Sequence, residues 1–133
     1  TVITAFQIFN NLPASSNEMK ADASAEKWSL EIESEMQSQN QAYLINFTAA
    51  WCITCQTNEK TALAREKVKE YLAEENIAYV KADWTNRNEE IAIGLAKYKR
   101  TGIPLYIFWK PGMPSSKILP AVLTEDSLIK SMQ

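Results

Sequence analysis

The chain has 133 residues, of which 46% are hydrophobic and 10% aromatic, which is the size and apolar content of one folded domain. Lys and Arg number 14 against 16 Asp and Glu, and the resulting net charge of −2 excludes the basic field that nucleic-acid binding needs. The sequence has no histidine and only 2 cysteines, which excludes His-based triads and an intramolecular zinc site built from Cys and His, so we expect neither a metal nor a nucleic-acid partner.

Residues 1–25 are expected to form an N-terminal lead-in or linker to a single domain at 26–133. Turn and linker residues gather at 10–17, after a short apolar run. The chain begins at Thr1 without a basic segment or an apolar signal core, so we expect a processed protein or an excised domain. Its longest uncharged stretch, 36–58, is interrupted by Gln, Asn, Ser and Thr, so we expect no membrane-spanning helix.

The first two elements of the expected domain are a helix and a strand. Apolar residues at helical spacing predict a helix over 25–39, with Trp28, Ile32 and Met36 facing inward. The nearly continuous apolar run 42–48 is rich in strand-forming residues. It therefore predicts a central strand that is covered on both faces.

The rest of the chain alternates between helices and strands. Residues 56–76 contain no Gly or Pro and carry apolar residues among charges, so they predict one long or one broken helix that ends at Asn76. Further strands are predicted at 77–82, 105–109 and 117–119, and further helices at 89–98 and from Thr124 onward. This order of elements predicts an α/β fold.

Cys52 and Cys55 are the residues with the clearest chemistry. They lie where a predicted strand ends and a predicted helix begins, and the partial positive charge of a helix N-terminus stabilises a thiolate. Cys52 is therefore predicted to be the nucleophile, and Cys55 the resolving thiol that attacks the mixed disulfide formed on Cys52. The alternative is an inert disulfide or half of a shared metal site, although closing a two-residue loop gains little entropic stabilisation.

Four sequence blocks resemble a known family: 48–59 (TAAWCITCQTNE), 81–86 (KADWTN), 102–106 (GIPLY) and 119–124 (LPAVLT). The Trp-Cys-x-x-Cys and Gly-Ile-Pro blocks resemble the thioredoxin superfamily. All four together resemble the C-terminal domain of DsbD-type thiol:disulfide interchange proteins. The resemblance implies a thioredoxin-like α/β fold, with a central mixed sheet of four to five strands flanked by helices.

The resemblance also implies residue roles around the cysteines. Ile103 and Pro104 would face the Cys pair, with Pro104 in the cis form and the Ile103 backbone pairing with an extended substrate strand. Without the resemblance we would predict a trans bond, because only about 5–6% of X–Pro bonds are cis in folded proteins. Trp51 would shield the thiols and contact partners, or else belong to the core.

Asn46 departs from the family pattern, whereas Glu59 matches it. Asn46 occupies the place of a buried acid that accepts a proton in the family. The side-chain amide of Asn46 cannot accept this proton. Glu59 matches a second family carboxylate, and its place one turn beyond Cys55 would let it raise thiol pKa values and accept the proton. The alternative is an exposed helix glutamate. Lys81 matches a lysine that pairs with the missing acid, so no role follows for it.

The function implied by the resemblance is that of a reducing electron relay. Such a domain is soluble and periplasmic, belongs to an inner-membrane electron transporter, and passes electrons between protein dithiols without a bound cofactor. We expect a monomer whose partners are the membrane electron-transfer domain and periplasmic disulfide proteins. The alternatives are an oxidant or isomerase of secreted proteins and, in another class, a binding module with a non-catalytic Cys pair.

Overall fold

The structure is a computed structural model that describes residues 25–133, so the expected lead-in at 1–25 and the domain boundary lie almost wholly outside the described residues. Five strands form one sheet in the order β1-β3-β2-β4-β5. Strands β1, β3 and β2 run parallel to one another, because β3 pairs in parallel with both β1 and β2. Strand β4 pairs antiparallel with β2, and β5 pairs antiparallel with β4. The strands are β1 (Glu26–Lys27), β2 (Tyr43–Thr48), β3 (Ala78–Asp83), β4 (Leu105–Trp109) and β5 (Lys117–Ile118). The expected mixed sheet is confirmed.

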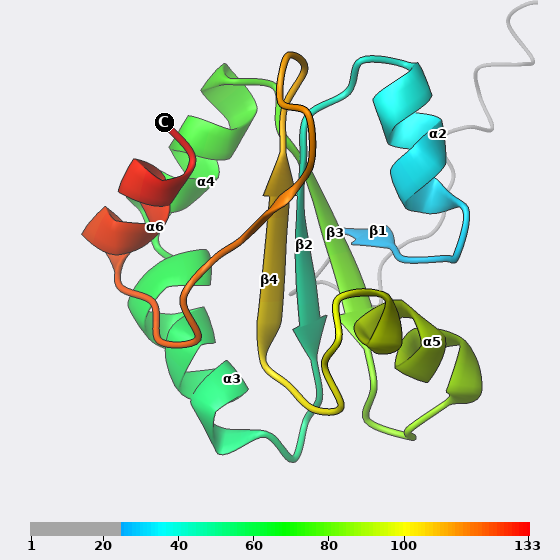
Figure 1. Ribbon diagram of the computed structural model, residues 1–133. Coiled ribbons are helices and arrows are strands. Elements are labelled where there is room, and N and C mark those ends of the chain that lie inside the picture. The colour runs from blue at the N-terminus through cyan, green and yellow to red at the C-terminus, as the bar shows by residue number, and fades with distance from the viewer. Residues whose placement is uncertain (1–24) are drawn as a thin grey trace, which may run out of the picture.

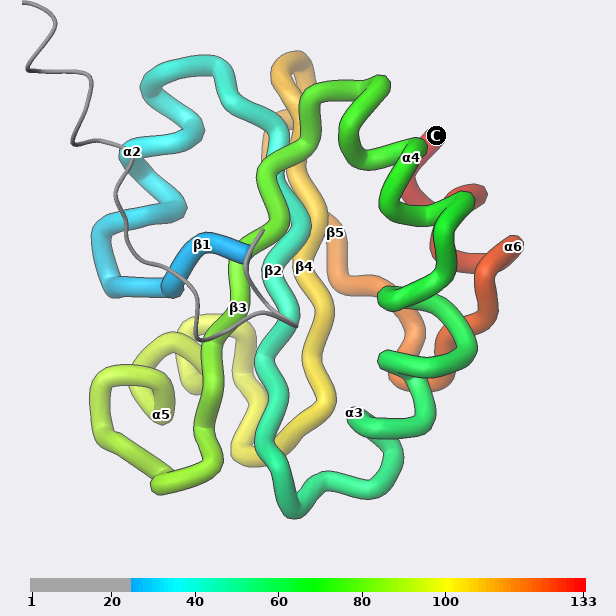
Figure 2. Tube along the Cα trace, turned by 180° about the vertical axis from the view of Figure 1, so that it is seen from behind, coloured from blue at the N-terminus to red at the C-terminus, as the bar shows by residue number. Residues whose placement is uncertain are grey.

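Helices cover both faces of the sheet, as Figures 1 and 2 show. On one face, α2 (Ile32–Ser38) and α5 (Glu89–Lys97) pack on the side chains of Tyr43, Ile45 and Phe47. The other face is covered by α3 (Ile53–Asn58), the π-helix η2 (Glu59–Leu63), α4 (Glu66–Glu74) and α6 (Glu125–Ser131). Within the described part of the chain, none of these helices has the length and hydropathy needed to cross a bilayer.

Strand β2 is the central strand that the sequence predicts. All its side chains are buried, and they alternate between the two apolar layers of the core. Its neighbours fix its register, with Phe47 opposite Ala82 on one side and Leu105 on the other. The chain therefore leaves the middle strand of the sheet at Thr48 and continues into the segment that carries the cysteines.

The predicted helix 25–39 is wrong over residues 25–31. Glu26 and Lys27 form the edge strand β1, which pairs in parallel with β3, and the Trp28 amide donates to the Lys81 carbonyl at 3.0 Å. Helix α2 begins only at Ile32. Trp28 and Met36 are buried as expected, because a turn between strand and helix brings both to the same core layer.

The predicted helix over 56–76 is the broken one of the two alternatives. It consists of α3, η2 and α4, and it is interrupted at Ala64 and Arg65. In η2 the backbone is wound more widely than in an α-helix, a form that occurs as short insertions near functional sites. Asn76 ends the segment in the left-handed conformation (φ 56°), which asparagine adopts more readily than most residues.

Candidate active site

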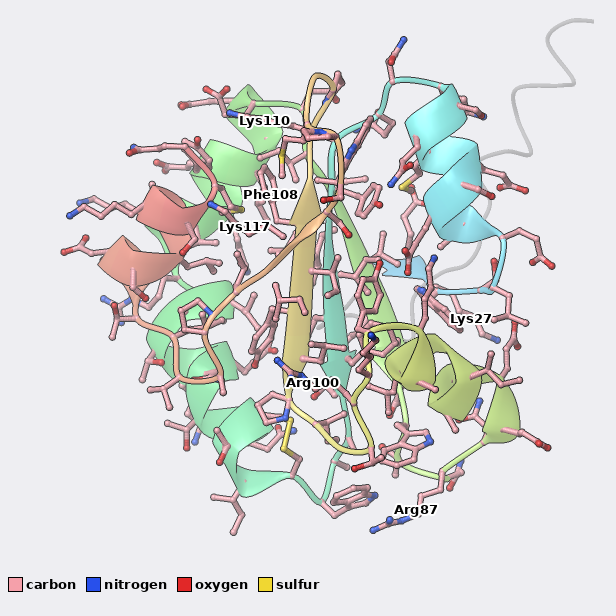
Figure 3. All side chains as sticks on the ribbon, in the orientation of Figure 1. Lys27, Arg87, Arg100, Phe108, Lys110 and Lys117 are labelled. Atoms are coloured by element: carbon pink, nitrogen blue, oxygen red, sulfur yellow. A yellow bond between two sulfur atoms is a disulfide. The ribbon has the colours of Figure 1, made fainter. Side chains whose placement is uncertain are left out.

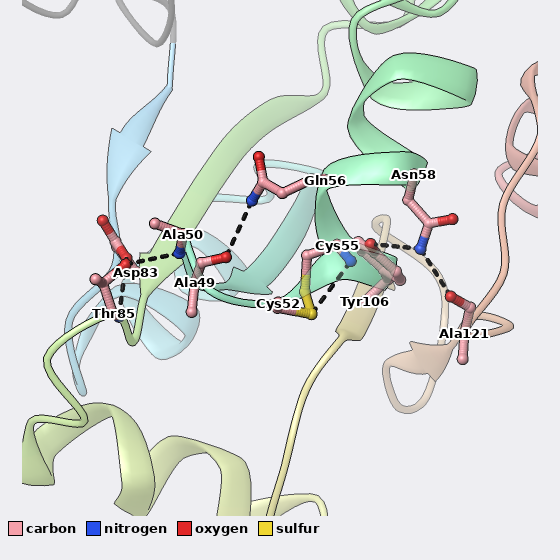
Figure 4. Close-up of a disulfide and its surroundings, with 10 residues drawn as sticks. All are labelled: Ala49, Ala50, Cys52, Cys55, Gln56, Asn58, Asp83, Thr85, Tyr106 and Ala121. Atoms are coloured by element: carbon pink, nitrogen blue, oxygen red, sulfur yellow. Dashed lines mark hydrogen bonds between the residues drawn. A yellow bond between two sulfur atoms is a disulfide. The ribbon is translucent and has the colours of Figure 1, made fainter.

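Cys52 and Cys55 form a disulfide where the loop after β2 enters α3 (Figure 4). Cys52 is the N-cap residue of α3, with an extended backbone (φ −91°, ψ 104°). Its Sγ accepts the Cys55 amide N–H at 3.1 Å, which is one of the amides that a helix start leaves without an intrahelical partner. This contact would stabilise a thiolate on Cys52 in the reduced form, because both the N–H and the helix dipole favour negative charge there.

The two cysteines differ in burial. Cys52 is 8% exposed and Cys55 only 2%, so Cys52 is the more accessible of the pair. Both pack in a small apolar cluster with Ala49, and Ile103 lies against it. The disulfide is thus buried, and Cys52 is its more exposed end.

Hydrogen bonds hold the loop before Cys52 in place. The Ala49 carbonyl accepts both the Cys52 amide at 3.2 Å and the Gln56 side chain at 3.0 Å. The Ala50 amide donates to Thr85 Oγ1 at 2.9 Å, and Thr85 in turn donates to Asp83 at the end of β3 (Figure 4). The Cys pair is thus fixed to two strands as well as to its own helix.

Trp51 lies at the surface beside the cysteines, and the alternative that places it in the core is wrong. Its side chain is 44% exposed, and its indole Nε1 donates to the Thr85 carbonyl at 2.9 Å. The neighbouring ring of Trp84 is centred 6.1 Å away, and Trp84 packs against the core. Arg87 lies over the Trp51 ring, with its guanidinium carbon 4.2 Å from the centroid of that ring.

The Ile103–Pro104 peptide bond is cis. This confirms what the family resemblance implies and makes the trans bond predicted from local statistics wrong. Ile103 is half-buried against the disulfide, because the antiparallel pairing of β4 with β2 brings the start of β4 to the edge where the cysteines lie.

Asn46 is buried in β2, with 1% of its surface exposed. Its Nδ2 donates to the Tyr79 hydroxyl at 2.9 Å, and its Oδ1 has no hydrogen-bond partner among the described residues. Lys81 lies directly opposite Asn46 on β3, as expected for the lysine that pairs with the family acid. The amide keeps this position neutral, so the interior beneath the cysteines has no carboxylate at this site.

Glu59 lies one turn beyond Cys55, and its backbone N–H donates to the Cys55 carbonyl. Its side chain is partly buried and lines a groove of about 700 Å³ together with Leu63 and Tyr79. The negative charge of Glu59 also reaches the interior: burial and this charge, opposed by a hydrogen bond from Asn58, raise the pKa of Tyr106 to about 12. The structure thus places a partly buried carboxylate one turn beyond Cys55, at the start of η2.

Asn58 is a buried residue of the site region that the sequence does not indicate. Its Nδ2 donates to the Tyr106 hydroxyl at 2.9 Å and to the Ala121 carbonyl at 2.7 Å, and its Oδ1 accepts the Leu123 amide at 2.9 Å. These bonds join the cysteine helix to β4 and to the segment before α6. No local pattern could have identified them, because every partner lies at least 48 residues away.

No group of three or more His, Cys, Asp or Glu side chains able to hold a metal ion occurs between residues 25 and 133. The polar groups at the site are instead those of a thiol–disulfide centre: two sulfurs, a helix N-terminus and a carboxylate one turn away.

Comparison with known proteins agrees with this geometry. A family model described as thioredoxin-like matches residues 24–111, about two-thirds of the chain. The chain belongs to the thioredoxin-like family. This membership and the Cys-x-x-Cys pair support thiol:disulfide redox activity.

Relatives of the thioredoxin-like chain include two interchange proteins. It is 24% identical over 100 residues to thiol:disulfide interchange protein DsbD of Campylobacter jejuni (strain RM1221), covering 75% of this chain and 17% of that protein. It is 33% identical over 73 residues to DsbD of Yersinia pestis (strain Pestoides F), covering 55% of this chain and 12% of that protein. The chain therefore spans less than a fifth of the length of these relatives.

Solved structures share the fold. The oxidised C-terminal domain of Neisseria meningitidis DsbD superposes with a TM-score of 0.64 at 18% identity, covering 80% of this chain and 95% of that domain. A thioredoxin from Thermus thermophilus superposes with a TM-score of 0.62 at 17% identity, covering 81% and 84% of the two chains. The fold class implied by the sequence blocks is therefore confirmed.

Proposed function

We propose that this thioredoxin-like chain is a reducing electron relay, a protein-disulfide reductase that passes electrons between protein dithiols. The observation that carries the proposal is the position of Cys52: it caps α3, its sulfur accepts the Cys55 amide, and it is the more accessible cysteine. A thiolate at such a position is a good nucleophile, and the buried Cys55 lies within bonding reach of it.

The proposed exchange has two steps that balance in electrons and protons. In the reduced protein, the Cys52 thiolate attacks one sulfur of the partner disulfide, which forms a mixed disulfide and releases the other partner sulfur as a thiolate that takes up a proton. Cys55 then loses its proton and attacks Cys52 Sγ. The Cys52–Cys55 disulfide forms, the second partner thiol leaves, and two electrons have passed to the partner.

The surroundings of Cys52 would position the partner. An extended partner segment would pair with the Ile103 backbone next to Pro104, since this loop lies against the disulfide. Trp51 would contact the same partner through its exposed ring. The site needs no bound cofactor, because the electrons move entirely through sulfur.

The cellular setting of the proposal comes from the DsbD relatives. We infer that residues 26–133 are one domain of a longer DsbD-type protein of the inner membrane, joined through residues 1–25 and facing the periplasm as a monomer. The match of the chain to under a fifth of each relative supports this arrangement. A membrane domain would reduce the Cys pair, and the reduced Cys pair would then reduce periplasmic disulfide proteins.

The reduction potential of the Cys pair tests the direction of the relay. Titration in thiol redox buffers, with alkylation and mass readout, should give about −200 to −270 mV, the range of glutaredoxins and thioredoxin. A value near −120 mV would make the protein an oxidant. A value below about −300 mV, or thiols that alkylate only after unfolding, would indicate a structural disulfide and a binding module.

Glu59 is proposed to accept the Cys55 proton in the second step. The two effects of this carboxylate predict opposite results for Glu59→Gln: loss of a proton acceptor slows the attack of Cys55, whereas loss of a like charge makes the Cys55 thiolate easier to form and speeds it. We expect release of the partner from the mixed disulfide to slow by about tenfold, which is less than the roughly 10²–10⁴-fold that a general base typically contributes, since water can replace the carboxylate in part.

Single-turnover kinetics separates the two steps of this test. Formation of the mixed disulfide should be nearly unchanged in Glu59→Gln, while its resolution slows. Glu74→Gln is the matched control, because Glu74 is an exposed carboxylate near the end of α4. Faster resolution in Glu59→Gln would assign the residue a purely electrostatic effect and remove it from the proton path.

A further inference from the structure

Arg87 forms a cluster with Trp51 and Trp84 at the end of the molecule that carries the disulfide. Its guanidinium carbon is 4.2 Å from the Trp51 ring centroid and 5.5 Å from that of Trp84. Its backbone is held in the left-handed conformation (φ 49°), and its amide donates to the Trp84 carbonyl at 2.9 Å. Figure 3 shows Arg87 extending outward at this end of the structure. We call these three residues the Arg-Trp cluster.

The Arg-Trp cluster orients a cation without using its hydrogen-bond donors. A guanidinium that stacks on an aromatic face leaves its N–H groups, which lie in the guanidinium plane, free to bind elsewhere. In the described part of the chain, Arg87 forms no ion pair and no side-chain hydrogen bond. The Trp51 ring beneath it is itself fixed by the bond from Nε1 to the Thr85 carbonyl.

The acidic residues nearest in the sequence form no ion pair with Arg87. Asp83 accepts both the amide and the hydroxyl of Thr85, and Glu90 accepts the Leu30 amide at 3.2 Å. Glu89, the first residue of α5, forms no ion pair with Arg87. Among the described residues, the guanidinium is therefore exposed, oriented and not ion-paired with a carboxylate.

Loop 84–88 lies at the edge of the sheet at which a partner disulfide must approach. The parallel pairing of β2 with β3 brings this loop beside loop 49–52, which carries Trp51 and Cys52. Arg87 is the only charged residue of these two loops, and the exposed residues Asp83 and Glu89 border loop 84–88 in the sequence.

We propose that Arg87 is a specificity-determining residue, which binds the carboxylate of an acidic side chain next to the partner's reactive cysteine. The proposal rests on the relay function above and names its substrate class: disulfides flanked by Asp or Glu. The guanidinium stacks on the ring of Trp51, the residue that immediately precedes Cys52 in the chain. A carboxylate bound there accepts two parallel N–H groups and holds the partner sulfur near Cys52.

Two peptide substrates and the full 133-residue chain test the proposal. The first peptide is acetyl-Ala-Glu-Cys-Glu-Ala-amide, the second has Gln in place of both Glu, and each is used as its symmetrical disulfide. Stopped-flow fluorescence at low ionic strength follows the oxidation of the reduced protein by each peptide. We expect the wild type to reduce the Glu peptide about three- to fivefold faster than the Gln peptide, the size of an exposed ion-pair effect, and to lose this preference in high salt.

The variant Arg87→Gln should reduce both peptides at the wild-type rate for the Gln peptide. If Arg87→Gln reduces the Gln peptide at the wild-type rate, the reactivity of Cys52 is intact. A merely structural role of Arg87 would instead predict slower reduction of both peptides. The control Lys67→Gln removes the same charge from the surface of α4 and should keep the preference.

Two results would overturn the assignment: a wild type without preference for the Glu peptide, or a preference that survives in Arg87→Gln. A wild type that reduces neither peptide contradicts the relay function itself. The two failures are therefore distinguishable.

Discussion

Replacing Cys52 by serine is expected to abolish the reduction of partner disulfides, with a loss of more than about 10³-fold, because the thiolate is the nucleophile. Replacing Cys55 by serine should leave the first step intact and stop the second. The mixed disulfide on Cys52 should then accumulate, since no neighbouring thiol can resolve it. Rates with a peptide disulfide, together with mass spectrometry of the protein after the reaction, measure both effects.

The two serine variants control for each other, because each removes the disulfide and one sulfur. Equal circular dichroism spectra would show that both remain folded, so that a difference in trapping reports on the role of each thiol. Trapping on Cys52→Ser through Cys55 would reverse the assigned roles. Partner binding that is unchanged in both variants, with no trapped species in either, would support the binding module.

The part of the site that the sequence predicts is the part set by local chemistry. The strand 42–48 is apolar because it is buried on both faces, and it leads directly into the Cys pair. Helix α6 is equally local, because Thr124 forms a reciprocal capping box with Ser127. In such segments neighbouring residues determine both the conformation and the place of the element.

Edge strand β1 shows where local patterns fail. Glu26 and Lys27 are exposed charged residues with no strand signal, and they are extended because β3 offers them a parallel partner more than 50 residues away. Helical spacing of the apolar residues from Trp28 onward therefore extended the predicted helix too far toward the N-terminus. The π-helical turn after α3 is similarly invisible, because its residues are ordinary helix formers.

Polar residues whose partners are distant were also missed. Glu33 is 3% exposed and accepts bonds from Lys97 and Tyr98 across the gap between α2 and α5, although the sequence suggests only a helix surface. Arg87 belongs to the Arg-Trp cluster only because β3 ends beside β2. The family resemblance predicted the cis bond at Pro104, but it could not identify contacts peculiar to this chain.

Asn58→Ala is expected to lower the free energy of unfolding by about 2–4 kcal/mol. The substitution removes three hydrogen bonds and leaves the Leu123 amide and the Ala121 carbonyl, both bonded to Asn58 in the native state, without their partner. A buried polar group that loses its partner costs roughly 1–3 kcal/mol. The bonds also anchor the end of α3, so the loss should be accompanied by faster alkylation of the reduced cysteines.

Urea unfolding of the reduced and oxidised forms measures this loss, and Asn86→Ala is the matched control. Asn86 is exposed in loop 84–88, so the same substitution should change stability by less than about 0.5 kcal/mol. The Tyr106 hydroxyl separates the two ways in which Asn58 can act. Tyr106→Phe removes one bond but keeps those to residues 121 and 123, so a loss as large as that of Asn58→Ala would place the stabilisation in the Asn58–Tyr106 contact. A much smaller loss would place it in the joining of the cysteine helix to the segment before α6, which is the arrangement that these bonds favour.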